Sequence, residues 1–326
     1  MSDQDDVQRT IAEQRAVQAQ VAQADRAAGE EKGGGATQAG ARRYPEPPMP
    51  AQHQEKPGNE ADLELAPMYD APFYKGSGKL EGKVAVITGG DSGIGRSVAV
   101  LFAREGADVA ILHLGEDEDA ATTKAAVEKE GRRAVTISGD VRDRAYCFAA
   151  VDQVLRELGG VDVLVNNAAF QVHTKRFEDL TEEHFDQTLR TNLYGYFHMA
   201  QACTPHMKPG SAIVNTGSVT GLMGNKDLLD YSTTKGGIHA FTRSLGTQLA
   251  PRHIRVNAVA PGPVWTPLNP TDKEAEDVKD FGASTVMKRP AQPEEIAPAY
   301  VFLASPQCSS YITGEVLPII GGYTGG

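Results

Sequence analysis

The sequence predicts an α/β protein built on one doubly wound, parallel β-sheet, and three observations point to it. Short apolar runs recur from Val84 onward, as expected of strands that are buried on both faces. Segments with the apolar spacing of helices alternate with these runs. A glycine-rich turn directly follows the first run, at residues 88–95. Such alternation requires right-handed crossovers, so the strands should lie parallel, with helices on both faces of the sheet.

The expected elements follow one another along the chain. The apolar runs predict strands at 84–88, 108–114, 134–140, 161–168, 211–218, 254–262 and 315–322. Helical patterns lie between them, at 98–104, 118–130, 145–158, 181–207, 231–249 and 294–303. A doubly wound sheet presents its ligand site at the carboxyl ends of its strands, so the chemistry is expected there.

The first 75 residues differ in composition from the rest. Residues 1–40 are rich in Ala, Gln, Glu and Asp, and residues 44–72 are rich in proline. Neither part has large apolar residues at the density of a core. We therefore expect a flexible Pro/Ala/Gln-rich extension at 1–75, disordered or loosely draped over a single domain at 76–326. Within it, one stripe of a weak helix is marked by Val7, Ile11, Val17 and Val21.

Charge and cysteine usage narrow the function classes. The net charge of −11 argues against binding to nucleic acid or to anionic membranes. The three cysteines are far apart and lack CxxC spacing, which predicts a reducing compartment and no metal site. The amino terminus has no apolar signal region, and no apolar stretch is long enough to span a membrane. The cytoplasm is the expected location.

The turn after the first strand is of a kind that binds phosphate. It reads TGGDSGIG over residues 88–95 and opens the first helix. Glycine tolerates the positive φ of a tight turn, and its missing Cβ lets the backbone approach a pyrophosphate. The helix that begins there offers free N–H groups and a partial positive charge. The turn therefore predicts a dinucleotide site, and the alternative is a tight turn without a ligand.

Three residues form a candidate acid–base set. Tyr231 and Lys235 are four residues apart, so they share one face of a helix, and Ser218 ends the fifth strand. Hydride transfer at a carbonyl carbon requires a proton to move at its oxygen. A phenol can supply that proton, and a nearby ammonium should lower its pKa from about 10. A chance surface pair is the alternative, and the glycine turn upstream argues against it.

With these residues in place, residues 83–322 resemble the short-chain dehydrogenases/reductases. The matching segments are TGGDSGIG (88–95), GDV (139–141), NNAA (166–169), TNL (191–193), Ser218, YSTTK (231–235) and PGPVWT (261–266). The family usually has glycine where Ala169 stands. The proline-rich extension and the segments around the motifs resemble a bacterial subgroup labelled glucose/ribitol-type dehydrogenases or aldehyde reductases. The resemblance implies a Rossmann-type NAD(P)-dependent oxidoreductase acting on a small aldehyde, ketone or secondary alcohol.

The resemblance also implies a role for each matching residue. Tyr231 would be the general acid/base, Lys235 would lower its pKa and bind the nicotinamide ribose, Ser218 would polarise the substrate carbonyl, and Asn192 would hold a water in a proton relay. Further cofactor contacts are expected from the glycine turn and from the ends of the later strands, at Gly89, Asp91, Ser92, Gly93, Ile94, Gly95, His113, Asp140, Val141, Asn167, Ala168, Pro261, Gly262, Val264 and Thr266.

The choice between NAD and NADP rests on the end of the second strand. An acidic residue there favours NAD and a basic one favours NADP, but the sequence reads His113-Leu114-Gly115, with neither signature in place. The acidic run 116–119 would repel a 2′-phosphate, or would simply begin a solvated helix. Arg96 offers the opposite choice, because it could pair with that phosphate. The acidic run leads us to expect NAD.

Loops after the fourth, fifth and sixth strands should contact the substrate, through Phe170, Gln171, His173, Leu222, Met223, Trp265, Leu268 and Phe281. The family resemblance implies a homotetramer paired through helices 181–207 and 231–249. Two other functions stay open. A nucleotide-sugar epimerase or dehydratase also uses YxxxK, but the glycine spacing and the short carboxyl-terminal part fit it less well. A cofactor-sensing or scaffold protein would bind a partner through the extension.

Overall fold

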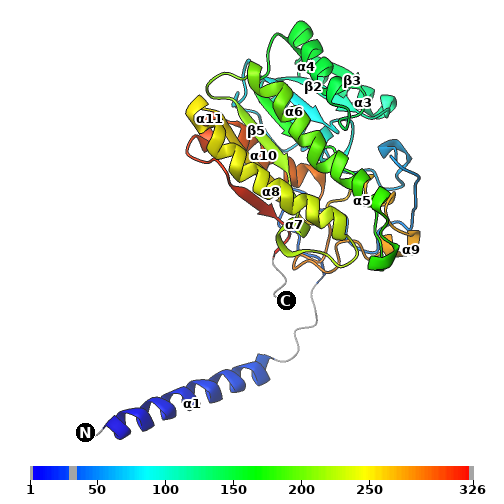
Figure 1. Cartoon of the computed structure of the whole chain (residues 1–326). Coiled ribbons are helices and arrows are strands. Elements are labelled where there is room, and N and C mark those ends of the chain that lie inside the picture. Colours follow the sequence, from blue (N-terminus) through cyan, green and yellow to red (C-terminus); the bar gives the residue numbers. More distant parts are fainter. Residues whose placement is uncertain (1–2, 29–34, 323–326) are drawn as a thin grey trace. The chain divides into compact units, whose positions relative to one another are not determined.

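A computed structural model describes residues 3–28 and 35–322 of the chain (Figure 1). The chain divides into two units, Met1–Thr37 and Gln38–Gly326. The described residues of the first unit include the helix α1 (Asp3–Ala28), on which Val17 and Val21 are exposed. The second unit contains the sheet. The compact unit thus begins at Gln38 and not at residue 76, where the change in composition placed the boundary.

The second unit is built on a seven-stranded sheet in the order β3-β2-β1-β4-β5-β6-β7. Every strand pair in it is parallel. This confirms the predicted doubly wound, Rossmann-type sheet. The strands are β1 (Val84–Thr88), β2 (Asp108–His113), β3 (Ala134–Ser138), β4 (Val163–Asn166), β5 (Ala212–Thr216), β6 (Arg255–Pro261) and β7 (Val316–Ile319).

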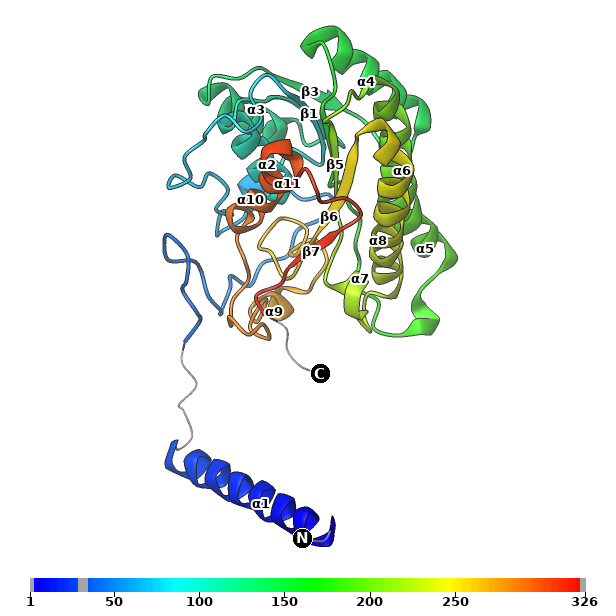
Figure 2. The same ribbon diagram turned by 90° about the vertical axis from the view of Figure 1, so that its left-hand side faces the viewer.

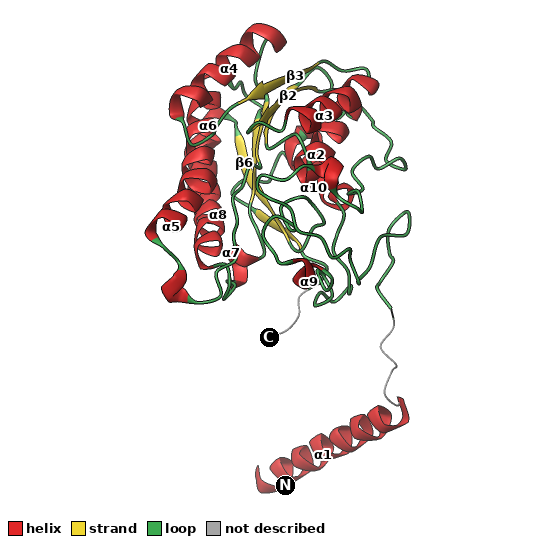
Figure 3. Cartoon of the chain, turned by 90° about the vertical axis from the view of Figure 1, so that its right-hand side faces the viewer, coloured by secondary structure: helices red, strands yellow, loops and turns green. Residues whose placement is uncertain are grey.

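Helices cover both faces of the sheet, as Figures 2 and 3 show. Along β1, Val86 and Ile87 point to opposite faces and belong to two separate apolar clusters. One face carries α2 (Gly93–Arg104), α3 (Asp117–Lys129), α10 (Pro293–Ala304) and the short α11 (Pro306–Ser309). The other face carries α4 (Arg144–Leu158), α6 (Gly195–Cys203) and α8 (Leu229–Leu249). Two one-turn helices, α7 (Thr220–Met223) and α9 (Ala275–Val278), lie in the loops after β5 and β6.

The segment predicted as one helix over 181–207 is interrupted. It consists of α5 (Glu182–Leu189), a π-helical turn at Arg190–Tyr194, α6, and a 3₁₀ turn at Thr204–His206. The remaining 3₁₀ turns are Glu60–Asp62, Phe177–Asp179 and Ala250–Arg252. A π-turn inside a helix is often found at a functional residue, and this one contains Asn192.

Residues 38–75 pack on the domain and are not loosely draped over it. Buried polar side chains of the domain bind both the backbone and a side chain of this segment. Glu294 accepts hydrogen bonds from Arg42 Nε (2.7 Å) and from the Ala71 N–H (2.8 Å), and the Trp265 indole donates to the Leu65 carbonyl (2.8 Å). The segment needs few apolar residues because these bonds satisfy its backbone, which is why its composition resembled that of a disordered chain. In the described part of the chain, no helix is long and apolar enough to cross a membrane.

Candidate active site

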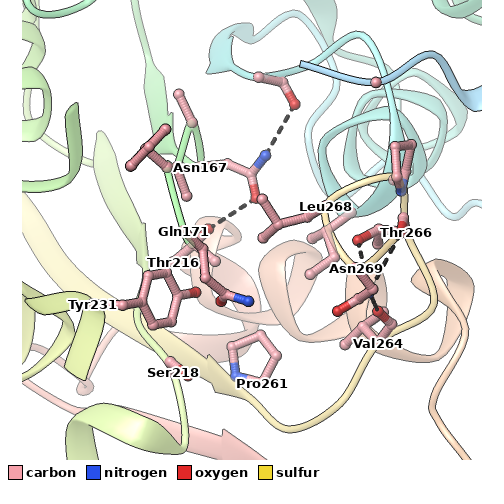
Figure 4. Close-up of a pocket in the computed structure, with 18 of the residues that line it drawn as sticks. Asn167, Gln171, Thr216, Ser218, Tyr231, Pro261, Val264, Thr266, Leu268 and Asn269 are labelled. Atoms are coloured by element: carbon pink, nitrogen blue, oxygen red, sulfur yellow. Dashed lines mark hydrogen bonds between the residues drawn. The ribbon is translucent and has the colours of Figure 1, made fainter. Parts of the chain in front are cut away.

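A cavity of about 760 Å³ opens at the carboxyl ends of the strands (Figure 4). Its walls come largely from the loops after β1 to β6, which are the loops that a doubly wound sheet offers to a ligand. A volume of this size suits a dinucleotide together with a small substrate. Almost all of the residues predicted from the sequence line it: Gly89, Asp91, Ser92, Gly93, Ile94, His113, Asp140, Val141, Asn167, Ala168, Ser218, Tyr231, Lys235, Pro261, Gly262, Val264 and Thr266.

The glycine turn has the geometry that the sequence predicted. Gly89 and Gly93 have φ of +60° and +51°. A Cβ added to Gly95 would lie 1.8 Å from the Gly89 carbonyl oxygen, so Gly95 packs the helix against the turn and does not line the cavity. Asn167 spans the turn and β5, because its Nδ2 donates to the Gly89 carbonyl (2.9 Å) and its Oδ1 accepts from Thr216 (3.2 Å). The turn is thus a preformed cradle that fits a pyrophosphate.

Tyr231 and Ser218 meet at the floor of the cavity (Figure 4). Tyr231 stands in the first turn of α8, and Ser218 stands just beyond the end of β5. Burial raises the pKa of Tyr231 well above its usual value, and the neighbouring Ser218 side chain opposes this rise. That the Lys235 ammonium lowers this pKa stays a prediction.

Lys235 lies beneath Tyr231 and is fully buried. Its Nζ is 5.3 Å from the centroid of the Tyr231 ring, and it donates to the Thr216 carbonyl (2.8 Å) and to the Tyr196 hydroxyl (3.4 Å). Burial lowers the pKa of Lys235 to about 7. The ammonium is therefore held at the floor of the cavity at a substantial cost in solvation.

Asn192 does not line the cavity, and no hydrogen bond joins it to Lys235 in the described structure. Its amide instead bridges two elements. The Nδ2 donates to the Phe170 carbonyl and to Thr234 Oγ1 (3.0 Å each), while the Oδ1 accepts from the Phe170 N–H (2.8 Å). Asn192 therefore fixes the loop after β4 against α8. The predicted water relay stays a prediction.

Some of the predicted substrate and cofactor contacts are wrong. Trp265 is fully buried and packs with Phe281 in a separate apolar cluster, and Leu222 and Met223 are exposed outside the cavity. Arg96 is buried and bound to Glu60 (2.5 Å) and Asp119 (2.9 Å), so it has no free guanidinium to offer a 2′-phosphate. Sequence spacing determines which loop a residue lies in, but not which way its side chain points.

Sequence reasoning missed a contribution from the amino-terminal segment. Lys56, Pro57 and Gly58 line the cavity, although they precede the sheet by more than twenty residues. Glu60 follows them and is 4% exposed. Its carboxylate accepts from the Gly93 N–H (2.6 Å) and from Arg96, which anchors this segment to the start of α2. No local sequence signal marks these residues, because their partners lie more than thirty positions away.

Replacing Glu60 should lower the stability of the folded chain. Glu60→Ala leaves the buried Arg96 with only one of its two carboxylates, and breaking a buried ion pair costs about 3–5 kcal/mol. We expect the urea midpoint of unfolding to fall accordingly. The matched control is Glu128→Ala, which removes an exposed pair with Lys124 at 3.9 Å and should cost less than about 1 kcal/mol. Equal midpoints for both variants would contradict the anchoring role of Glu60.

Comparison with known proteins agrees with this geometry. Residues 89–324 match the family described as "Enoyl-(Acyl carrier protein) reductase". The solved structure of a short-chain dehydrogenase from Burkholderia cenocepacia in complex with NADP superposes with a TM-score of 0.70 and 34% identity, over 75% of this chain and 98% of that one. The chain belongs to the short-chain dehydrogenase/reductase family.

Two relatives are similar to this short-chain dehydrogenase/reductase over most of its length. "Glucose and ribitol dehydrogenase" of Daucus carota is 49% identical, over 84% of this chain and 96% of its own. "NADPH-dependent aldehyde reductase 1, chloroplastic" of Arabidopsis thaliana is 47% identical, over 82% and 95%. The protein is thus an NAD(P)-dependent oxidoreductase acting on CH–OH or C=O groups. Neither the epimerase nor the scaffold alternative is favoured by these matches.

Proposed function

We propose that Tyr231 is the general acid/base in hydride transfer between a nicotinamide and a small aldehyde, ketone or secondary alcohol. The observation that carries this proposal is that Tyr231, Ser218 and Lys235 line the same cavity as the glycine turn. A bound nicotinamide dinucleotide would supply or accept the hydride. Because burial raises the pKa of Tyr231, the phenol keeps its proton at neutral pH, ready to be given to a carbonyl oxygen.

The other residues of the set act through position and charge. Ser218 donates to the substrate oxygen and orients it beside the phenol. Lys235, when protonated, stabilises the phenolate that remains after Tyr231 has given up its proton. Asn192 is proposed to hold the water of a proton relay, and its bonds to the Phe170 backbone keep the substrate side of the cavity in place. A panel of aldehydes, ketones and alcohols, followed through the absorbance of reduced nicotinamide, tests the assignment of the reaction.

The substrate end of the cavity is mainly apolar with a few polar groups. Phe170, Leu268 and Phe281 line it, and Gln171 and His173 are held there by the buried carboxylate of Asp272. This mixture suits a carbonyl compound of modest size. The relatives' names concern a sugar, a polyol and aldehydes, so the panel should include all three classes. Turnover of none of them would refute the proposed substrate class.

We propose that the enzyme prefers NAD to NADP. Glu116 is 8% exposed and lines the cavity at the end of β2. Its Oε2 accepts from the Leu114 N–H (3.0 Å), whereas its buried Oε1 has no hydrogen-bond partner among the described residues. A carboxylate oxygen in this place can accept a ribose hydroxyl and repels a 2′-phosphate. Asp91 beside it adds to the repulsion whenever it is ionised, and burial raises its pKa to about 6.

Neutralising Glu116 should therefore shift the coenzyme preference. We expect Glu116→Gln to raise the ratio of kcat/KM for NADPH over NADH about tenfold, because one charge close to the phosphate is removed. Asp117→Asn is the matched control, since the Asp117 side chain is 83% exposed and does not line the cavity. Initial rates with both coenzymes measure the ratio. A wild-type enzyme with a tenfold preference for NADPH would overturn the proposal.

We further propose a cytoplasmic homotetramer. Tyr194 and Phe197 are exposed on the π-turn and α6, and Leu229 is exposed at the start of α8, so these helices present apolar side chains to a partner. All three cysteines are free, which fits a reducing compartment. Light scattering of the purified chain tests the assembly, and a stable monomer would refute it.

A further inference from the structure

Residues 56–60 connect two parts of the site, and the first three of them line the cavity. At one end, Glu60 binds the Gly93 N–H at the start of α2. At the other end, the Lys56 ammonium lies 5.4 Å from the centroid of the Phe170 ring, in the loop after β4. Five residues span at most about 14 Å from first to last Cα, so this segment is short and has contacts at both ends.

The charge of Lys56 has no close counter-charge. Its Nζ donates to Thr271 Oγ1 (3.3 Å), and no carboxylate of the described residues lies within ion-pair distance of it. Burial lowers the pKa of Lys56, and the charge of Asp272 opposes this effect. The Asp272 carboxylate is already occupied, since Gln171 and His173 both donate to it. Lys56 is thus a half-buried cation that lines a ligand cavity.

Buried charges in proteins are normally paired, and a charge that lines a ligand cavity can find its partner in the ligand. We propose that Lys56 is an anion-binding residue of this site and donates to a phosphoryl or carboxylate oxygen of the bound ligand. Two sources can offer that oxygen. One is the diphosphate of the dinucleotide, which the glycine turn would hold. The other is an anionic substituent on the substrate. The inference rests on the proposed function and adds a ligand contact to it.

The test compares Lys56→Met with Lys56→Arg, which keeps the charge, and with Lys208→Met. Lys208 is exposed and outside the cavity, so its replacement makes the same change in net charge without touching the site. Titration calorimetry of the full chain measures the affinity for ADP, which carries a diphosphate, and for adenosine, which does not. Steady-state rates measure kcat/KM for succinic semialdehyde, which carries a carboxylate, and for butanal, which is neutral.

A charge-assisted hydrogen bond is worth about tenfold or more in affinity. If the diphosphate is the partner, Lys56→Met lowers the affinity for ADP at least tenfold and leaves the affinity for adenosine unchanged. If the substrate is the partner, Lys56→Met lowers the ratio of kcat/KM for succinic semialdehyde over butanal at least tenfold. The affinity for ADP then stays unchanged. In either case Lys56→Arg retains most of the wild-type value. The inference is overturned if both ratios stay within twofold of those of Lys208→Met.

Failure of this inference is distinguishable from failure of the proposed function. Unchanged ratios in an enzyme that still reduces butanal through Tyr231 would remove Lys56 from the site and leave the reaction assignment standing. Absence of Tyr231-dependent turnover on any carbonyl would remove the proposed function, while the comparison of ADP with adenosine would still report on Lys56. Thermal unfolding of each variant shows whether a loss of affinity reflects a loss of fold.

Discussion

Replacing Tyr231 with phenylalanine is expected to lower kcat by about 10²–10⁴, the range contributed by general acid–base catalysis. The change removes only the hydroxyl. Because the Tyr231 side chain is 8% exposed and phenylalanine keeps the ring, the packing of α8 should survive. Coenzyme affinity should change little, so the loss should fall on kcat. Steady-state rates on the best carbonyl substrate, with coenzyme binding measured separately, test this expectation.

The control for this prediction is Tyr311→Phe, which removes a phenol hydroxyl from a fully exposed side chain. It should retain wild-type rates. If Tyr231→Phe kept kcat within threefold of the wild type, the proton at the substrate oxygen would have to come from another group. Besides Tyr231, the phenol that contacts Lys235 in the described structure is Tyr196, whose hydroxyl donates to the Thr216 carbonyl at the end of β5 (3.1 Å).

Replacing Lys235 with methionine should have two opposite effects. Turnover should fall about 10²-fold or more, because the charge that stabilises the Tyr231 phenolate is lost. The free energy of unfolding of the protein without ligand should rise by about 1–3 kcal/mol, since a buried ammonium is replaced by an apolar side chain of similar length. The Thr216 carbonyl is not left without a partner, because Tyr196 also donates to it. In the wild-type enzyme, Lys235 would thus support turnover at a cost in stability.

The gain in stability should depend on pH in a defined direction. The folded-state pKa of Lys235 is about 7 and the unfolded value is 10.5, so between these values the unfolded chain binds more protons. Wild-type stability therefore rises with pH in this window. The advantage of Lys235→Met should be greatest at or below pH 7 and should shrink toward pH 10.5. Urea unfolding at several pH values, with Lys208→Met as control, measures it. A variant less stable than wild type at pH 7 would contradict this account.

The sheet and the site were predictable because both are encoded by short segments. Each buried strand is a continuous apolar run such as Val84–Thr88, and a glycine turn between a strand and a helix has few alternative structures. Tyr231 and Lys235 lie in one segment, and Ser218 lies at a strand end. Their meeting follows from the rule that parallel strands present their carboxyl ends on one side of the sheet.

The amino-terminal segment was not predictable because it depends on pairings between distant residues. Buried carboxylates of the domain hold it, among them Glu105, which accepts from Tyr74 and from the Ser77 N–H, and Glu294. In the sequence, these residues cannot be told from solvated charges. The π-turn that contains Asn192 likewise has no apolar pattern of its own, since it continues the helical spacing on either side.

The central claim is that the Tyr231 phenol exchanges a proton with the substrate oxygen at the carboxyl ends of the strands. A crystal structure of the enzyme with dinucleotide and a carbonyl substrate or its alcohol analogue tests this claim most directly. The account predicts that Tyr231 Oη and Ser218 Oγ both lie within about 3.2 Å of that oxygen. A complex in which the reacting oxygen contacts neither hydroxyl, while the nicotinamide lies against the reacting carbon, would contradict it.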